Sequence, residues 1–195
     1  MPSSADADDQ LSTALSNGVD RVHAAARAVD TRPVVVLIDG RSGAGKTTFA
    51  RRLAARWEAG ADVAVLKLDD IYPGWDGLQA GAATAAEVIR AVRGGAVGRW
   101  RAWDWDGDTA SARLCGVAAR DVLIVEGAGL LTATSIPLAD VTVWLEAPEP
   151  SRRARALHRD GDAYRPHWER WSAQESEHLR RDDPRSRADI VIDLP

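Results

Sequence analysis

The segment Gly40–Thr47, with the sequence GRSGAGKT, fits the pattern G-x-x-x-x-G-K-[ST] in full. An apolar run at 34–39 precedes it and a helical pattern at 46–57 follows, which is the context this motif requires. Its glycines let successive N–H groups turn toward phosphate oxygens, and the following helix adds its positive end. We therefore predict binding of ATP with Mg²⁺ rather than an empty strand-to-helix turn. The predicted nucleotide contacts are Gly40, Ser42, Gly43, Ala44, Gly45, Lys46, Thr47 and Thr48.

Acidic residues follow two further apolar runs. Asp69 comes after 63–68, and Glu126 comes after 122–125. The ends of parallel strands meet at one edge of a sheet, so these acids should lie beside the phosphate loop. Mg²⁺ prefers a few carboxylates together with phosphate oxygens, and a second acid can deprotonate a hydroxyl group. We predict Thr47, Glu126 and Asp69 around the metal and Asp69 as the base; the alternative is that the acids at 69–70 only cap a loop.

The motifs together resemble a known family. Leu68-Asp69-Asp70-Ile71-Tyr72 is similar to the D-[ST]-[FY]-Y segment of uridine kinases, and the phosphate loop, Val125-Glu126-Gly127 and the spacing R-x-x-R-x-x-x-R-D before Asp160 occur in family order. The resemblance spans 34–160 and is to the uridine kinase branch of the P-loop kinases, which is related to phosphoribulokinase and bacterial pantothenate kinase. It implies that Asp69 is the base, that Glu126 belongs to the magnesium site, and that the arginine-rich stretch is a lid over the triphosphate. The residues at 70 and 71 depart from the family pattern.

Arginines recur at steps of three and four in the segment 149–159. Arg152, Arg155 and Arg159 therefore share a helix face, and Arg165 follows across an expected loop at 160–165. Phosphoryl transfer needs positive charge over the migrating group, which arginine supplies. We predict Arg155, Arg159 and Arg165 as catalytic residues of the lid, and Lys46 as the catalytic residue of the phosphate loop. The alternative for the arginines is a solvated helix face.

The acceptor side is predicted from two segments, 69–81 and 96–113. Asp69, Tyr72, Trp75 and Asp104 are the predicted substrate contacts, and a flat acceptor could stack on tryptophan. The alternative for the aromatic residues is core packing. The acceptor is expected to be a nucleoside; a vitamin precursor such as pantothenate, a sugar or a nucleotide remains open, as does an ATP-binding regulator without an acceptor. The sequence contains no N-K-x-D motif, which favours adenine.

These residues need a sheet to bring them together. Buried runs alternate with helical patterns, which predicts an α/β fold of three layers, α/β/α, with a five-stranded, mainly parallel sheet and an arginine-rich lid. We expect one P-loop kinase-like domain over 1–195, with a flexible tail at 1–8, a first helix at 9–29, a helix at 84–93 and lid helices within 149–181. The expected strands are 34–39, 63–68, 122–125, 141–145 and 190–192.

Composition narrows the remaining classes. The net charge of −4 and pI near 5.6 argue against a general nucleic-acid binder. No apolar run approaches the ~20 residues that a membrane span needs, and the acidic start of the sequence has no signal-peptide pattern. One cysteine, Cys115, cannot form an internal disulfide. We therefore expect a cytoplasmic protein with ATP and a small hydroxyl compound as partners, and a homo-oligomer is left open.

Overall fold

A parallel sheet forms the centre of the protein in the computed structural model, which describes residues 4–58 and 60–195. The sheet has five strands in the order β2-β5-β1-β6-β7, and all its pairs are parallel. The strands are β1 (Val34–Asp39), β2 (Val63–Lys67), β5 (Val122–Glu126), β6 (Val141–Glu146) and β7 (Ile190–Asp193). The predicted sheet and its five strands are confirmed.

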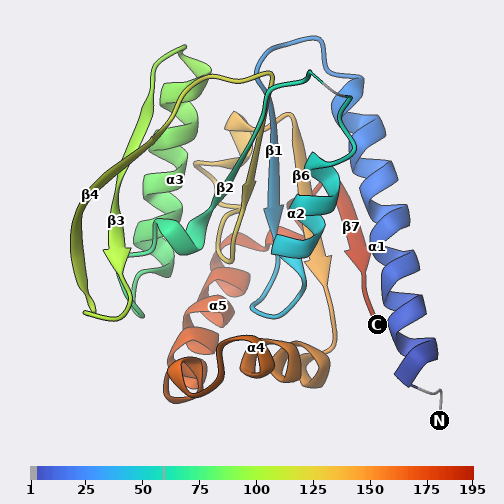
Figure 1. The fold of residues 1–195 in the computed structure, drawn as a ribbon, viewed down its shortest axis with the longest axis vertical. Helices are drawn as coiled ribbons and strands as arrows, with labels where there is room; N and C mark the ends of the chain where they lie inside the picture. The colour runs from blue at the N-terminus through green and yellow to red at the C-terminus, as the bar shows by residue number, and fades with distance from the viewer. Residues whose placement is uncertain (1–3, 59) are drawn as a thin grey trace.

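The register of the central strands determines where the candidate residues meet. On β5, Glu126 is paired both with Ile38 of β1 and with Lys67 of β2. The three strands therefore finish level with one another, at the lower edge of the sheet in Figure 1. Every residue of β1 and β5 is buried, as expected for β-branched runs covered on both faces.

Helices cover both faces of the sheet and separate two apolar cores. The first core lies under α1 (Ser4–Arg27) and α2 (Lys46–Ala54), and the second under α3 (Leu78–Arg93) and α5 (Trp168–Asp182). Alternate residues of β1 serve the two cores: Val36 packs in the first, while Val35 and Leu37 pack in the second. Two sets of helices on opposite faces make the three predicted layers (Figure 1).

The helix α1 packs closely on the layers beneath it. It approaches β7 and α2 at Gly18, where a Cβ atom would lie 2.7 Å from Ile192 Cδ1 and 3.1 Å from Phe49. The helix begins at Ser4, before the predicted start at residue 9, and residues 1–3 of the predicted tail at 1–8 lie outside the described part. None of the helices within the described ranges is long and apolar enough to cross a membrane.

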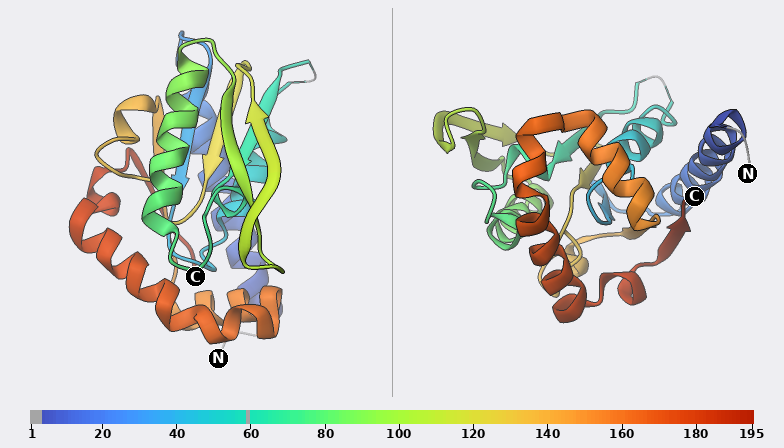
Figure 2. Two further views of the ribbon diagram at one scale, coloured as in Figure 1. Left: turned by 90° about the vertical axis from the view of Figure 1, so that its left-hand side faces the viewer. Right: turned by 90° about the horizontal axis from the view of Figure 1, so that it is seen from below.

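A two-stranded antiparallel hairpin stands outside the main sheet. It consists of β3 (Gly98–Asp104) and β4 (Thr109–Val117) and packs against α3 (Figure 2). The contact is closest at Gly98, where a Cβ atom would lie 2.7 Å from Val88 Cγ1. The pairing of the two strands is not regular throughout, because its register shifts between Arg101 and Trp103.

Two helices pass beneath the carboxyl ends of the strands, as Figure 2 shows from below. They are α4 (Glu149–Tyr164) and α5, joined by a 3₁₀ turn at Arg165–His167, and the short helix α6 (Pro184–Arg187) follows. Gly161, with a φ of 56° and a ψ of −132°, is not helical, so two helical pieces of α4 meet there in a kink. The interruption predicted within 160–165 is therefore present, as a kink at Gly161 instead of a loop.

The helix α3 also begins earlier than its pattern predicts, at Leu78 instead of Thr84. It includes Gly81, whose small size admits the ring of Tyr72; a Cβ atom there would lie 2.4 Å from that ring. A glycine that typically indicates a loop is here a close-packing residue inside a helix.

Candidate functional site

The phosphate loop connects β1 to α2 and is shaped by three glycines. Gly40, Gly43 and Gly45 have φ angles of 149°, 77° and 99°, which residues with side chains rarely adopt. Gly43 also touches α4, because a Cβ atom there would lie 2.0 Å from the carbonyl oxygen of Arg152. The helix α2 begins at Lys46, so its first N–H groups point into the loop, where an anion would be held.

Lys46 is nearly buried and folds back across this loop. Its ammonium group donates to the carbonyl oxygens of Gly40 (2.7 Å) and Arg41 (3.1 Å). The positive charge is thus fixed at the mouth of the loop, next to the N–H groups. A phosphate bound there would meet both the N–H donors and the lysine charge.

The next residue, Thr47, faces a carboxylate from a neighbouring strand. Its hydroxyl donates to Glu126 Oε1 at 2.8 Å, and the side chain of Glu126 is buried at the end of β5. Burial raises the pKa of Glu126, the charge of Lys46 opposes that rise, and the charge of Asp69 adds to it. A threonine hydroxyl and one carboxylate beside a phosphate site are the oxygen ligands that Mg²⁺ takes when phosphate oxygens and waters complete its shell. The pair therefore fits Mg²⁺ by the chemistry of its oxygen atoms. No group of three or more histidine, cysteine or acidic side chains within 4–58 and 60–195 could form a metal site by itself.

Asp69 lies in a 3₁₀ turn, Leu68–Asp70, directly after β2. The hairpin holds this turn by two indole groups: Trp105 Nε1 donates to the carbonyl oxygen of Asp69 (3.1 Å), and Trp100 Nε1 to that of Asp70 (3.0 Å). Both bonds use backbone oxygens, and the carboxylate of Asp69 stays exposed. The turn is thus fixed while its carboxylate remains accessible to a substrate.

Tyr72 is placed differently from the prediction. It is 1% exposed, and its hydroxyl donates to the carbonyl oxygen of Ala128 at 2.7 Å. Its ring packs edge-to-face on Trp171, and burial raises its pKa well above the usual value. Tyr72 is a core residue beneath the turn, so the predicted acceptor contact is corrected to a packing role.

Asp104 also has a structural role. It lies at the end of β3, where its carboxylate accepts hydrogen bonds from the backbone N–H groups of Asp106 (3.2 Å) and Gly107 (3.1 Å). These bonds cap the turn of the hairpin, as aspartate commonly does. Asp104 is exposed, and its predicted contact with an acceptor stays a prediction.

Trp75 belongs to an aromatic cluster between the hairpin and the junction of α4 and α5. Its indole is half-buried and stacks on His167, with ring centres 4.1 Å apart and planes 8° apart. It also meets Trp105 edge-on (5.0 Å) and Tyr164 face-on (5.4 Å). Trp105 thus contacts both Trp75 and the backbone of Asp69. The predicted contact of Trp75 with an acceptor stays a prediction.

The arginines of α4 divide into two groups. Arg152 is buried and donates to the carbonyl oxygens of Ala147 (3.0 Å) and Ser42 (3.2 Å), while Arg155 donates through Nε to that of Gly43 (2.9 Å). These contacts attach α4 to the phosphate loop. Arg159 and Arg165 lie further along and are exposed, and their closure over a phosphate stays a prediction.

A network of buried polar side chains lies beneath the phosphate loop, and the sequence did not predict it. Asp39, the last residue of β1, accepts hydrogen bonds from the N–H groups of Gly40 (2.6 Å), Gly129 (3.0 Å) and Leu131 (2.7 Å). Its carboxylate also contacts His178 Nε2 of α5 at 3.0 Å, and His178 Nδ1 contacts Asp182 at 2.8 Å. One carboxylate therefore ties together the start of the loop, the segment after β5, and α5.

A second set of contacts joins α5 to the phosphate loop, through a residue one helical turn before His178. Glu175 is buried, accepts the N–H group of Ser42 at 2.6 Å, and pairs with the guanidinium of Arg41 at 3.1 Å. Asp39 is an acid at the end of a buried strand, as Glu126 is. It was not predicted as a functional residue because the sequence pattern includes it in the strand. No sequence pattern would have identified His178 or Glu175, because their partners lie more than 130 residues away.

The fold class can be identified from three features. They are the order of the strands, the loop after the central strand, and the carboxylates at the ends of the adjacent strands. This is the fold of the P-loop kinases, and the resemblance to that group is confirmed at the level of the fold. A family model described as Zeta toxin matches residues 19–96, less than half of the chain. None of the curated proteins matches the sequence.

Several solved structures share the fold. A possible uridine kinase from Bacillus stearothermophilus is 23% identical, with 92% of this chain and 99% of that chain covered and a TM-score of 0.68. A candidate fructose transport system kinase from Silicibacter sp. TM1040 is 20% identical over 91% of this chain and 98% of that chain, with a TM-score of 0.61. D-glycerate 3-kinase from Cryptococcus neoformans var. grubii is 13% identical over 79% of this chain and 78% of that chain, with a TM-score of 0.51. At these identities the likeness establishes the fold.

Proposed function

We propose that the protein is an ATP-dependent kinase that transfers the γ-phosphate of ATP to a hydroxyl group of a small molecule. The observation that carries the proposal is the group of Lys46, Thr47 and Glu126, with Asp69 at the neighbouring strand end. A nucleotide-binding loop alone could serve a regulator. Transfer to an acceptor also requires a base, and the exposed carboxylate of Asp69 can serve as one.

Each residue has a distinct role in this proposal. The loop N–H groups and Lys46 bind the β- and γ-phosphates, and Thr47 and Glu126 would hold Mg²⁺, which when bound neutralises charge on the phosphate oxygens. Asp69 orients the acceptor hydroxyl and takes its proton as the oxygen attacks the γ-phosphorus, and ADP leaves. Arg159 and Arg165 are proposed to approach the transferring group from α4 and the turn that follows it.

A nucleoside is the first acceptor to test. The aromatic cluster around Trp75 offers flat apolar surface for a base, linked through Trp105 to the turn that carries Asp69. The solved structures that share the fold include a candidate fructose transport system kinase and a D-glycerate 3-kinase. Pantothenate-like, sugar and nucleotide acceptors therefore belong in the same panel. A regulator without an acceptor predicts that none of these compounds accelerates ADP formation.

The proposal is tested by measuring ADP release with each acceptor for wild type, Asp69→Asn and Asp70→Asn. Asp70 is the matched control, because it lies in the same turn and its carboxylate is also exposed. Asp69→Asn should lower kcat about 10²–10⁴-fold, the usual contribution of a general base, while the Kd for ATP stays within about twofold. Asp70→Asn should keep kcat near the wild-type value. Equal losses in both variants, or full activity of Asp69→Asn, would refute the role of Asp69.

A further inference from the structure

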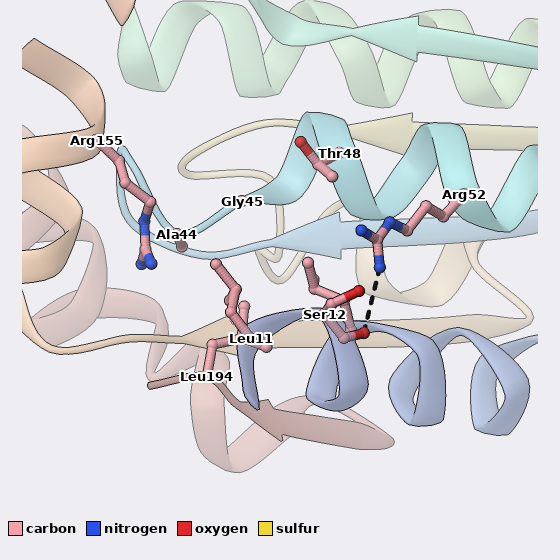
Figure 3. A pocket seen from close by; sticks show the side chains of 9 residues that line it. Leu11, Ser12, Ala44, Gly45, Thr48, Arg52, Arg155 and Leu194 are labelled. Atoms are coloured by element: carbon pink, nitrogen blue, oxygen red, sulfur yellow. Dashed lines mark hydrogen bonds between the residues drawn. The ribbon is translucent and has the colours of Figure 1, made fainter. Parts of the chain in front are cut away.

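A pocket of about 190 Å³ lies beside the phosphate loop, on the side of α1. Figure 3 shows side chains of α1, the start of α2, α4 and the segment after β7 around it. Its lining residues are Leu11, Ser12, Leu15, Ala44, Gly45, Thr48, Arg52, Arg155 and Leu194. The volume is below the ~300–1,000 Å³ of a complete small-molecule site, so the pocket suits one part of a larger ligand.

The residues that line the pocket indicate which part of the ligand it would bind. Leucines from α1 and from the segment after β7 make apolar walls suited to a flat ring. The charged side chains in the lining are two arginines, Arg52 and Arg155, and the lining contains no acid. A ligand with an apolar ring and acceptor or anionic atoms matches this combination.

One polar atom in the pocket wall lacks a partner. Arg155 donates through Nε to Gly43 and through Nη1 to the carbonyl oxygen of Pro195 at 3.5 Å. Its Nη2 atom is buried and has no hydrogen-bond partner in the part of the chain that the structure describes. Buried donors are normally satisfied, so an acceptor on a ligand bound beside Arg155 would supply the missing partner.

The position of the pocket relative to the phosphate loop indicates which part of the nucleotide it would hold. Ala44, Gly45 and Thr48 belong both to the pocket and to the predicted phosphate contacts, so the pocket is continuous with the loop. Glu126 contacts Thr47 from β5, which lies between β2 and β1, whereas α1 lines the pocket. A triphosphate whose γ-end lies by Glu126 and Asp69 would direct its nucleoside toward α1.

We propose that α1 is a wall of the nucleoside pocket and that Leu11, Ser12 and Leu15 contact the base and ribose of the bound nucleotide. The helix is fixed there by the close approach at Gly18 and by Arg52, which donates to the carbonyl oxygen of Ser12 at 3.3 Å. The inference rests on the proposed nucleotide binding. It assigns the first helix to substrate recognition in addition to packing.

The test compares ATP with inorganic tripolyphosphate, which has the phosphates but no nucleoside. Calorimetric Kd values would be measured for wild type, Ser12→Trp and Ser16→Trp. Ser16 is the matched control, one helical turn further along α1 and exposed. Wild type should bind ATP at least tenfold more tightly than tripolyphosphate. Ser12→Trp, which fills the pocket, should weaken ATP at least tenfold and leave tripolyphosphate within about twofold, and Ser16→Trp should change neither.

Unchanged ATP affinity in folded Ser12→Trp, or an equal loss for both ligands, would overturn the assignment of α1. If Ser12→Trp does not fold, Ser12→Leu gives the same comparison with less added bulk, and its loss should again be confined to ATP. Lys46→Ala separates the two levels of the proposal, because it should weaken both ligands. If Lys46→Ala binds ATP as tightly as wild type does, the proposed nucleotide site is wrong. If Lys46→Ala weakens ATP binding but Ser12→Trp leaves the Kd for ATP unchanged, only the assignment of the pocket is wrong.

Discussion

Replacing Asp39 by asparagine tests the network of buried polar side chains beneath the phosphate loop. Its two carboxylate oxygens accept four contacts, from Gly40, Gly129, Leu131 and His178. An asparagine amide keeps one oxygen, so about two of these donors lose their acceptor whichever way the amide is turned. Each buried donor left unsatisfied costs about 1–3 kcal/mol, which sums to about 2–6 kcal/mol.

Removing one partner of a buried charged pair typically costs about 3–5 kcal/mol, within the range counted from the lost hydrogen bonds. This is a large share of the ~5–15 kcal/mol by which a domain is stable. For a chain of this size 1 kcal/mol shifts the Tm by about 2–4 °C, so Asp39→Asn should lower the Tm by roughly 6–20 °C.

The assay is thermal unfolding followed by circular dichroism, with Asp193→Asn as the matched control. Asp193 also ends a strand of the sheet, but its side chain is 69% exposed and pairs with Arg185 at 3.0 Å. Exposed pairs are worth about 0–1 kcal/mol, so this Tm should fall by no more than about 4 °C. The reasoning is wrong if Asp39→Asn destabilises the protein no more than Asp193→Asn does.

Two further predictions concern the same layer of the structure. Burial lowers the pKa of His178, but its hydrogen bonds to Asp39 and Asp182 and their charges outweigh burial and raise it above 6.5. The stabilisation that protonated His178 provides is therefore complete below about pH 6.5 and is lost as the pH rises through the folded-state pKa. The difference in urea midpoint between wild type and His178→Gln should accordingly shrink as the pH is raised above about 6.5. A difference that does not change with pH would contradict this sign. Tyr72→Phe should cost about 1–3 kcal/mol in urea unfolding, because the carbonyl of Ala128 loses its donor, while the acceptor KM stays unchanged. A severalfold rise in that KM would show that Tyr72 does contact the acceptor.

Local patterns predict the parts of the site that local chemistry determines. The loop Gly40–Thr47 and Asp69 directly follow strands, and Glu126 is the last residue of one. The ends of strands can be predicted from short apolar runs in the sequence. The hairpin turn at Asp104 had a readable signal too, because Gly107 follows three residues later and aspartate commonly caps such turns.

Other features depend on contacts between distant segments. Tyr72 is buried because Gly81 and Trp171 pack around it, and neither neighbour is evident from the run that contains Asp69. His178 meets Asp39 only after α5 has docked across the sheet. Packing of this kind is set by the tertiary structure, so propensity and spacing could not predict it.

The two indole groups that hold the turn at Asp69 and Asp70 also give the protein a built-in optical signal. Indole emission depends on the hydrogen bond of its N–H group and on the polarity around the ring. Trp100 and Trp105 donate to the backbone of the turn itself, so a displacement of that turn alters their surroundings directly. Molecules that settle beside Asp69 can therefore be followed by intrinsic fluorescence of the unlabelled protein, without any turnover.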